Sequence, residues 1–191
     1  MFRPTSTTSA QAPASQALRI RRLSRLLAAA CLALIVGLAL AVPIAWALAD
    51  VSVLASQAHL NPADIQAAPQ LWQRLLGAAI TSVPVALLSM GLWQARRCFL
   101  GFKRGQVFTA QAVQCLRRFA AWVMGSAVAA IVAAPLLSVV LTLGNAPGER
   151  QLVVGVGSDF PLTLLFAAIV WLMAAVIDQG MALADENAAF V

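Results

Sequence analysis

Four long apolar runs, almost free of charged residues, constrain this chain more than any other feature. They cover about residues 26–49, 75–95, 119–144 and 160–181. An α-helix needs about 20 residues to cross a hydrocarbon core about 30 Å thick. The sequence therefore predicts an all-α fold, in which residues 19–191 form one integral membrane bundle of four transmembrane helices.

The composition agrees with a membrane protein. Apolar residues make up 61% of the chain and charged residues 10%, against roughly 45–50% and about 25% in soluble domains. A net charge of +6 would raise nucleic-acid binding in a soluble domain. Here the basic residues flank the apolar runs in short segments. We therefore interpret them as topology signals and expect no nucleic-acid partner.

The residues that usually carry chemistry are sparse. The chain has one histidine, His59, and three cysteines without a CxxC pair, Cys31, Cys98 and Cys115. Metal sites need denser clusters of such ligands, so we expect free thiols and no metal or cofactor. No loop carries paired carboxylates or a nucleophile with an evident base, so we predict that the protein is not an enzyme.

The N-terminal segment, residues 1–18, is rich in Ser, Thr, Ala, Gln and Pro and is predicted to be a disordered tail. A secretory signal is an alternative for the first apolar run, because Ala47-Leu48-Ala49 fits a cleavage pattern. That run is longer than the 7–15 residues typical of a signal core, and three further spans follow. These points favour a retained first span.

The positions of the basic residues predict the orientation. Eleven of the 13 Lys and Arg residues lie before the first span or between the second and third. Cytoplasmic loops carry an excess of Lys and Arg. We therefore expect a bacterial inner-membrane protein with both termini in the cytoplasm. The basic residues before the first span are Arg3, Arg19, Arg21, Arg22 and Arg25, and Arg74 and Arg150 lie in the outward loops.

The spans contain prolines and rows of small residues. Pro43, Pro84 and Pro135 lie inside the first three spans and predict kinks. Small residues at four-residue spacing allow close helix approach. They predict the tightest contact between the first and third spans, although an alanine-rich chain also produces such rows by chance. The rows are Ala33, Gly37 and Ala41, and Gly125, Ala129 and Ala133.

Residues 95–118 alternate basic and apolar side chains and predict a helix-turn-helix elbow lying on the inner leaflet. Gly105 allows a turn, and Thr109 is suited to cap the helix that enters the third span. Cations of the elbow would meet anionic lipid headgroups. The alternative is a docking surface for a partner. The basic residues of the elbow are Arg96, Arg97, Lys103, Arg104, Arg117 and Arg118.

The C-terminal segment is acidic. Asp178 lies at the inner end of the fourth span, and Asp185 and Glu186 follow without a neighbouring cation. We expect these carboxylates to face the elbow and to pair with Arg96, Arg97, Arg117 or Arg118. In the first outward loop, Asn61 and Pro62 predict the start of a short helix.

Two segments resemble a known family. RGQVFTAQAVQCLRR, residues 104–118, and GMALADENAAFV, residues 180–191, are similar to the bacterial membrane proteins grouped as the domain of unknown function family 2975. By architecture the resemblance extends from about residue 20 to the end. It implies a small four-span protein with a basic elbow and an acidic tail. The matching residues are Gly105, Val107, Phe108, Thr109, Val113, Leu116, Arg117, Gly180, Leu183, Glu186 and Asn187.

The resemblance implies no established activity. Some relatives are encoded beside small helix-turn-helix regulators, which favours a regulatory or accessory role. We predict contacts to membrane lipids, to a protein partner at the cytoplasmic face, or within a homo-oligomer. A small-solute transporter or channel subunit is the alternative. The predicted contact residues are Arg96, Arg97, Lys103, Arg104, Gly105, Phe108, Thr109, Arg117, Arg118, Asp178, Glu186 and Asn187.

Overall fold

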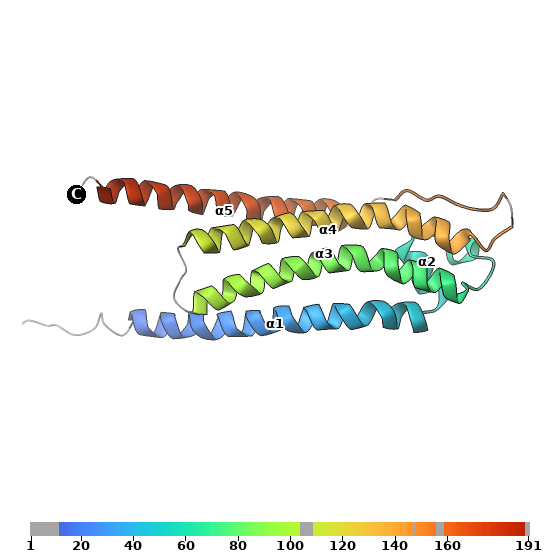
Figure 1. Cartoon of the computed structure of the whole chain (residues 1–191), viewed down its shortest axis with the longest axis horizontal. Coiled ribbons are helices and arrows are strands. Elements are labelled where there is room, and N and C mark those ends of the chain that lie inside the picture. The colour runs from blue at the N-terminus through green and yellow to red at the C-terminus, as the bar shows by residue number, and fades with distance from the viewer. Residues whose placement is uncertain (1–11, 104–108, 147, 156–158, 190–191) are drawn as a thin grey trace, which may run out of the picture.

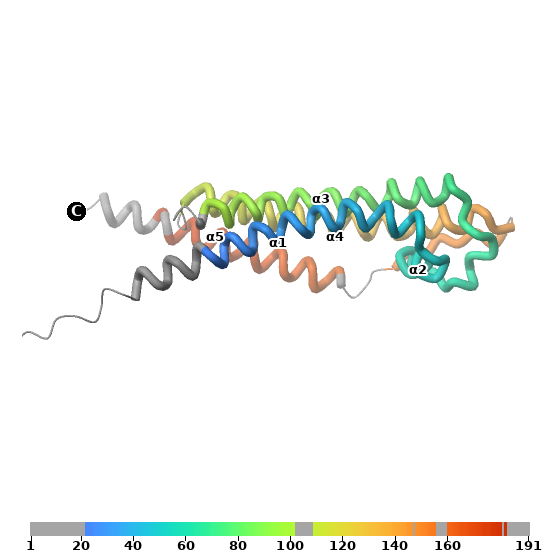
Figure 2. Tube along the Cα trace, turned by 90° about the horizontal axis from the view of Figure 1, so that it is seen from below, coloured from blue at the N-terminus to red at the C-terminus, as the bar shows by residue number. Residues whose placement is uncertain are grey.

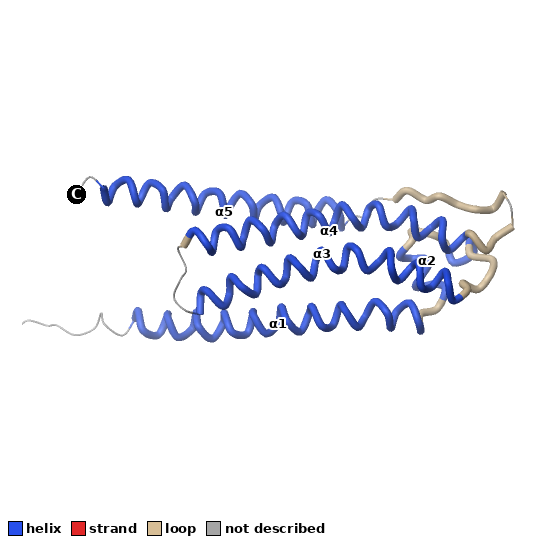
Figure 3. Tube along the Cα trace, in the orientation of Figure 1, coloured by secondary structure: helices blue, strands red, loops and turns tan. Residues whose placement is uncertain are grey.

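A computed structural model describes residues 12–103, 109–146, 148–155 and 159–189 of the chain (Figure 1). Over these ranges the secondary structure is helical, with loops and no strand (Figure 3). The elements are α1 (Ala12–Leu48), α2 (Val51–Gln57), the 3-10 helix η1 (Pro62–Asp64), α3 (Leu71–Lys103), α4 (Ala110–Thr142) and α5 (Asp159–Ala189).

Four of the helices are long and apolar enough to cross a membrane, which confirms the predicted four-span bundle. Their membrane-length segments are Arg22–Leu48, Leu71–Gly101, Ala110–Thr142 and Phe160–Gly180. Helix α1 begins at Ala12. The last part of the predicted N-terminal tail is therefore helical, and residues 1–11 lie outside the described residues.

The helices pack mainly in chain order. Helix α3 contacts both α1 and α4, and α5 packs on α4 (Figure 1). In the turned view, α2 and the start of α5 lie to the same side of the layer that α1, α3 and α4 form (Figure 2). One end of the bundle holds the start of α1, the end of α3, the start of α4 and the end of α5 (Figure 1). We call this the elbow end, and the opposite end, which carries α2 and η1, the loop end.

The predicted tight contact between the first and third spans is wrong, because α3 lies between α1 and α4. Gly37 is exposed, and a Cβ added to it would meet nothing within 4 Å. A Cβ added to Gly125 would likewise meet nothing within 4 Å. Small residues at this spacing arise in an alanine-rich helix without marking a contact, which was the alternative interpretation.

The close approaches between the long helices are made by other glycines, both on α3. A Cβ on Gly91 would lie 3.3 Å from Trp122 Cβ of α4. A Cβ on Gly77 would lie 2.1 Å from the Trp46 ring of α1. Each glycine therefore lets a tryptophan-bearing helix approach the backbone of α3.

Hydroxyl groups within the spans mostly bond to their own helix. Thr81 Oγ1 donates to Gly77 O at 2.8 Å, and Ser138 Oγ donates to Pro135 O at 2.8 Å. Ser126 differs, because its hydroxyl on α4 donates to Pro84 O on α3 at 2.9 Å. These bonds place backbone and hydroxyl groups in contact inside an apolar layer, where unpaired polar groups are costly.

The elbow differs from its prediction. Helix α3 continues without a break to Lys103, and α4 begins at Ala110, so the two flanks of the elbow extend the spans and do not form a separate surface helix pair. Cys98 and Val113 are buried, and this burial favours continued helix on both sides. Thr109 caps α4 as predicted, since its Oγ1 accepts a hydrogen bond from Ala112 N at 3.2 Å.

The loop end contains a compact core that the sequence did not reveal. Trp46 is 2% exposed, and it packs with the buried residues of α2, the first loop and the end of α4. The predicted short helix after Asn61 is the single turn η1, where Asp64 Oδ2 accepts a hydrogen bond from Asn61 N at 3.1 Å. The other core residues are Leu54, Ala55, Ala58, Leu60, Ile65, Leu137 and Leu141.

Candidate functional site

The elbow end carries a cavity of about 340 Å³ between the last turns of α3 and the first turns of α4. Its polar side chains come from both helices, and the thiols of Cys98 and Cys115 also line it. The continuation of α3 past the predicted end of its span creates this cavity. Its polar lining residues are Gln94, Arg97, Thr109, Gln111, Gln114 and Arg118.

Two of these residues are cations without a counter-charge. Arg97 and Arg118 are exposed, and neither has an ion-pair or hydrogen-bond partner among the described residues. Arg96 points elsewhere, because its guanidinium carbon lies 5.1 Å from the centroid of the Trp93 ring. This cation–π contact gives the Arg96 guanidinium a partner on its own helix. The cavity therefore carries two arginines that are free to meet an anion.

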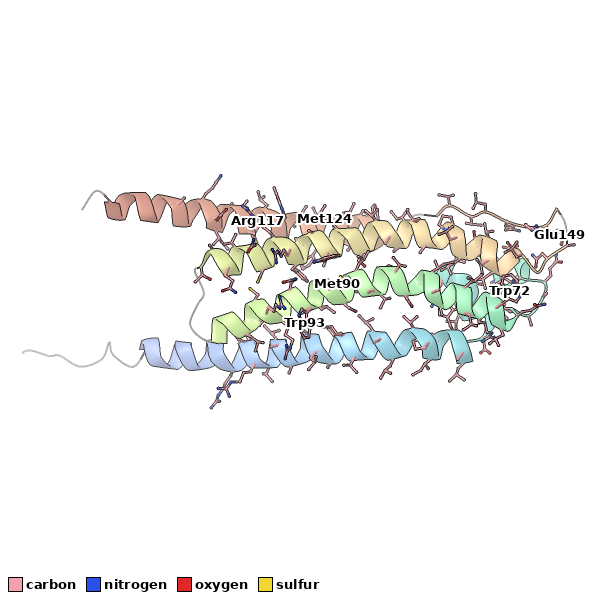
Figure 4. All side chains as sticks on the ribbon, viewed as in Figure 1. Trp72, Met90, Trp93, Arg117, Met124 and Glu149 are labelled. Atoms are coloured by element: carbon pink, nitrogen blue, oxygen red, sulfur yellow. The ribbon has the colours of Figure 1, made fainter. Side chains whose placement is uncertain are left out.

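A salt bridge joins α4 to α5 beside this cavity. Arg117 Nη2 lies 2.9 Å from Asp178 Oδ2, and the two side chains are 41% and 44% exposed. Figure 4 places Arg117 on the part of α4 that lies beside α5. The pairing of Asp178 with one of the four named arginines is confirmed. A partly exposed pair of this kind stabilises by about 0–1 kcal/mol, so its main effect is to fix where α5 leaves the bundle.

Several predicted contact residues fall outside the described part of the structure. Arg104, Gly105 and Phe108 lie outside the described residues. Lys103, Glu186 and Asn187 lie in described helices, but their side chains lie outside the description. The residues that the structure brings together at the elbow end are Arg97, Thr109, Arg117, Arg118 and Asp178.

At the loop end, a buried amide joins the α1–α3 loop to the α4–α5 loop. Asn145 is 7% exposed, and its Nδ2 donates to Asp64 O at 2.7 Å. Its Oδ1 accepts from Gln66 N at 3.2 Å. Gln66 Nε2 also donates to Glu149 Oε2, and Gln151 Nε2 donates to Asp64 Oδ1 at 3.3 Å. These bonds are structural, since they hold the loops together without presenting a nucleophile or an acid–base pair.

Two further polar residues at the start of α3 hold helix ends in place. Gln73 is 2% exposed, and its Nε2 donates to Val140 O of α4 at 2.8 Å. Arg74 Nη1 donates to the carbonyl oxygens of Trp46 and Ala47, each at 3.0 Å. A cation at the carboxyl end of α1 satisfies carbonyls that have no partner within the helix. Sequence reasoning treated Arg74 only as a charge at the edge of a loop.

A second cavity, of about 400 Å³, lies among α3, α4, α5 and the loops. Its wall is mostly apolar, and its polar members are His59, Ser126 and Thr163. Ser126 is already bonded to Pro84 O. The apolar lining residues include Leu88, Val123, Ala127, Ala130, Ile131 and Phe160.

Four apolar helices of membrane length, with polar residues gathered near the two ends of the bundle, define a small multi-pass membrane protein. The chain belongs to the protein family of unknown function DUF2975, whose model matches residues 56–191. This confirms the resemblance, and the matched region begins after α1. No curated protein and no solved structure matches the chain.

Proposed function

We propose that the protein is a regulatory or accessory component of the bacterial inner membrane, which binds a cytoplasmic protein through its elbow end. The orientation rests on the basic residues, eleven of 13 of which precede the first span or lie between the second and third spans in the sequence. The binding face would combine the basic ends of α3 and α4 with the acidic end of α5.

The Arg117–Asp178 pair is the observation that carries this proposal. It anchors α5 on α4 at the level of the basic residues. Beyond it, α5 runs on to Ala189 and projects past the start of α4 (Figure 1). Asp185 and Glu186 lie on this projecting segment. A partner with both basic and acidic patches would therefore meet complementary charge on one face.

A crosslinking pull-down from native membranes tests this proposal. One variant neutralises Arg96, Lys103 and Arg104 to Gln, and a second carries Asp185→Asn with Glu186→Gln. The matched control is Arg22→Gln with Arg25→Gln, which removes charge from exposed residues of α1 at the same end. We expect one protein to be captured by the wild type and the control and to be lost from both test variants. Equal capture by all four chains would reject the proposal.

The transporter or channel alternative needs polar or charged groups near the midplane of the bundle. The larger cavity has a mostly apolar wall, and Thr81, Ser82 and Ser138 donate to carbonyls of their own helices. These observations favour the accessory role. Solute flux into liposomes containing the protein, above that of empty liposomes, would instead support transport. The absence of enzymatic activity and the formation of a homo-oligomer stay predictions.

A further inference from the structure

The cavity between α3 and α4 at the elbow end has the features of an anion site. We propose that it binds the phosphate of an anionic phospholipid from the adjacent leaflet. This goes beyond the proposed function, because a lipid would occupy the cavity whether or not a protein docks on the projecting end of α5.

The cavity carries positive charge from both of its helices. Arg97 enters the cavity wall from α3 and Arg118 enters it from α4. The nearby carboxylate that the structure describes, Asp178, is bonded to Arg117, and none of the described residues that line the cavity is acidic. Guanidinium groups match the geometry of phosphate oxygens and form charge-assisted hydrogen bonds with them. The two arginines are therefore available for a single anionic group placed between the helices.

The cavity also offers neutral hydrogen-bond donors. The amide side chains of Gln94, Gln111 and Gln114 line the same cavity, and each can donate to a phosphate ester oxygen. Helix α4 begins at this wall, with Thr109 as its cap. The positive end of the helix dipole adds to the attraction for an anion.

The depth of the cavity favours a lipid over a soluble phosphate as its ligand. Trp93 lies one turn before Arg97, is 41% exposed, and carries Arg96 over its ring. An exposed tryptophan with a cation over its ring is typical of the membrane interface. The cavity also includes Leu100 and Gly101 in its wall. A lipid whose acyl chains lie along α3 would have its phosphate at the level of the two arginines.

Native mass spectrometry of the full chain in detergent tests the proposal, with phosphatidylglycerol and phosphatidylcholine as probes. The test variant is Arg97→Gln with Arg118→Gln, and the control is Arg22→Gln with Arg25→Gln. We expect about a tenfold weaker affinity for phosphatidylglycerol in the test variant and little change in the control. Phosphatidylcholine should bind more weakly than phosphatidylglycerol to the wild type.

A charge-preserving variant and a competition experiment complete the test. Arg97→Lys with Arg118→Lys preserves charge but loses the planar fork, so its affinity should lie between those of the wild type and the Gln variant, provided that the unfolding temperatures agree. Glycerol phosphate added in excess should not displace the lipid. An equal loss of phosphatidylglycerol affinity in the test and control variants would show that general surface charge causes the binding. That result would overturn the proposal. Displacement by glycerol phosphate would overturn its lipid source.

Discussion

The ring of Trp46 occupies the space that a side chain on Gly77 would need, since a Cβ there would lie 2.1 Å from the indole. Two further contacts hold Trp46, because its Nε1 donates to Thr81 Oγ1, one turn after Gly77 on α3, at 3.2 Å and its ring belongs to the loop-end core. The ring therefore cannot move aside without disturbing both contacts. This contact fixes α1 against α3.

Gly77→Ala should accordingly destabilise the protein by about 1–3 kcal/mol, the range for overpacking a well-packed site. The measurement is thermal or denaturant unfolding in detergent. Gly125→Ala is the control, because it lies in the middle of α4 with nothing within 4 Å of a new Cβ. The control should be neutral or more stable by up to about 1 kcal/mol, since Ala favours helix over Gly. Equal stability of the two variants would contradict this packing.

The Arg117–Asp178 pair predicts a charge-reversal rescue. Arg117→Asp alone and Asp178→Arg alone should each place like charges side by side and loosen α5 from α4. The double variant should recover the wild-type protection of the C-terminal segment from added protease. The effect on global stability should be small, about 0–1 kcal/mol. A double variant as sensitive as either single variant would show that the pair does not dock α5.

Asn145→Ala should weaken the loop end more than any exposed polar change there. The buried side chain bonds to Asp64 O and to Gln66 N, so its loss leaves two backbone groups without their partners. The expected cost is about 1–3 kcal/mol. Gln66→Ala is the matched comparison, because it removes an exposed side chain from the same loops. Faster hydrogen exchange of the Gln66 amide in Asn145→Ala would support the assignment, and unchanged exchange would refute it.

The three free thiols should differ in reactivity. Cys31 and Cys98 are buried at 7% exposure each, whereas Cys115 is half-buried in the wall of the elbow-end cavity. Access limits thiol modification as much as ionisation does. A maleimide added to the folded protein should therefore label Cys115 first, and all three thiols should react after denaturation. Peptide mass spectrometry gives the order, and earlier labelling of Cys98 would contradict it.

Local rules were enough to predict the spans and the elbow-end pair. The apolar runs located four helices of membrane length. The cap at Thr109 and the partner of Asp178 followed from residues whose roles depend on their immediate neighbours and on charge. The elbow was placed on the membrane surface because its charge pattern resembles an interfacial helix. Instead, Cys98 and Val113 are buried, and their burial favours continuation of α3 and α4 as helices beyond the predicted spans.

The loop end could not be predicted in the same way. Asn145 and Asp64 are far apart in the sequence, and neither stands out among other loop residues. The role of Trp46 depends on the position of Gly77, which only the packing of α1 on α3 reveals. The rows of small residues led to a wrong prediction of helix contact. In an alanine-rich helix such spacing is common, so it carries little information about which helices touch.

A photo-crosslinking amino acid placed at Ala182 tests the central claim most directly. Ala182 is exposed on α5, four residues beyond Asp178, and Val154 at the loop end is a matched exposed site at 70% exposure. Irradiation of intact cells should join one specific protein to the chain carrying the probe at Ala182 and not to the chain carrying it at Val154. A specific adduct only at Val154, or none at Ala182, would contradict a cytoplasmic partner at the elbow end.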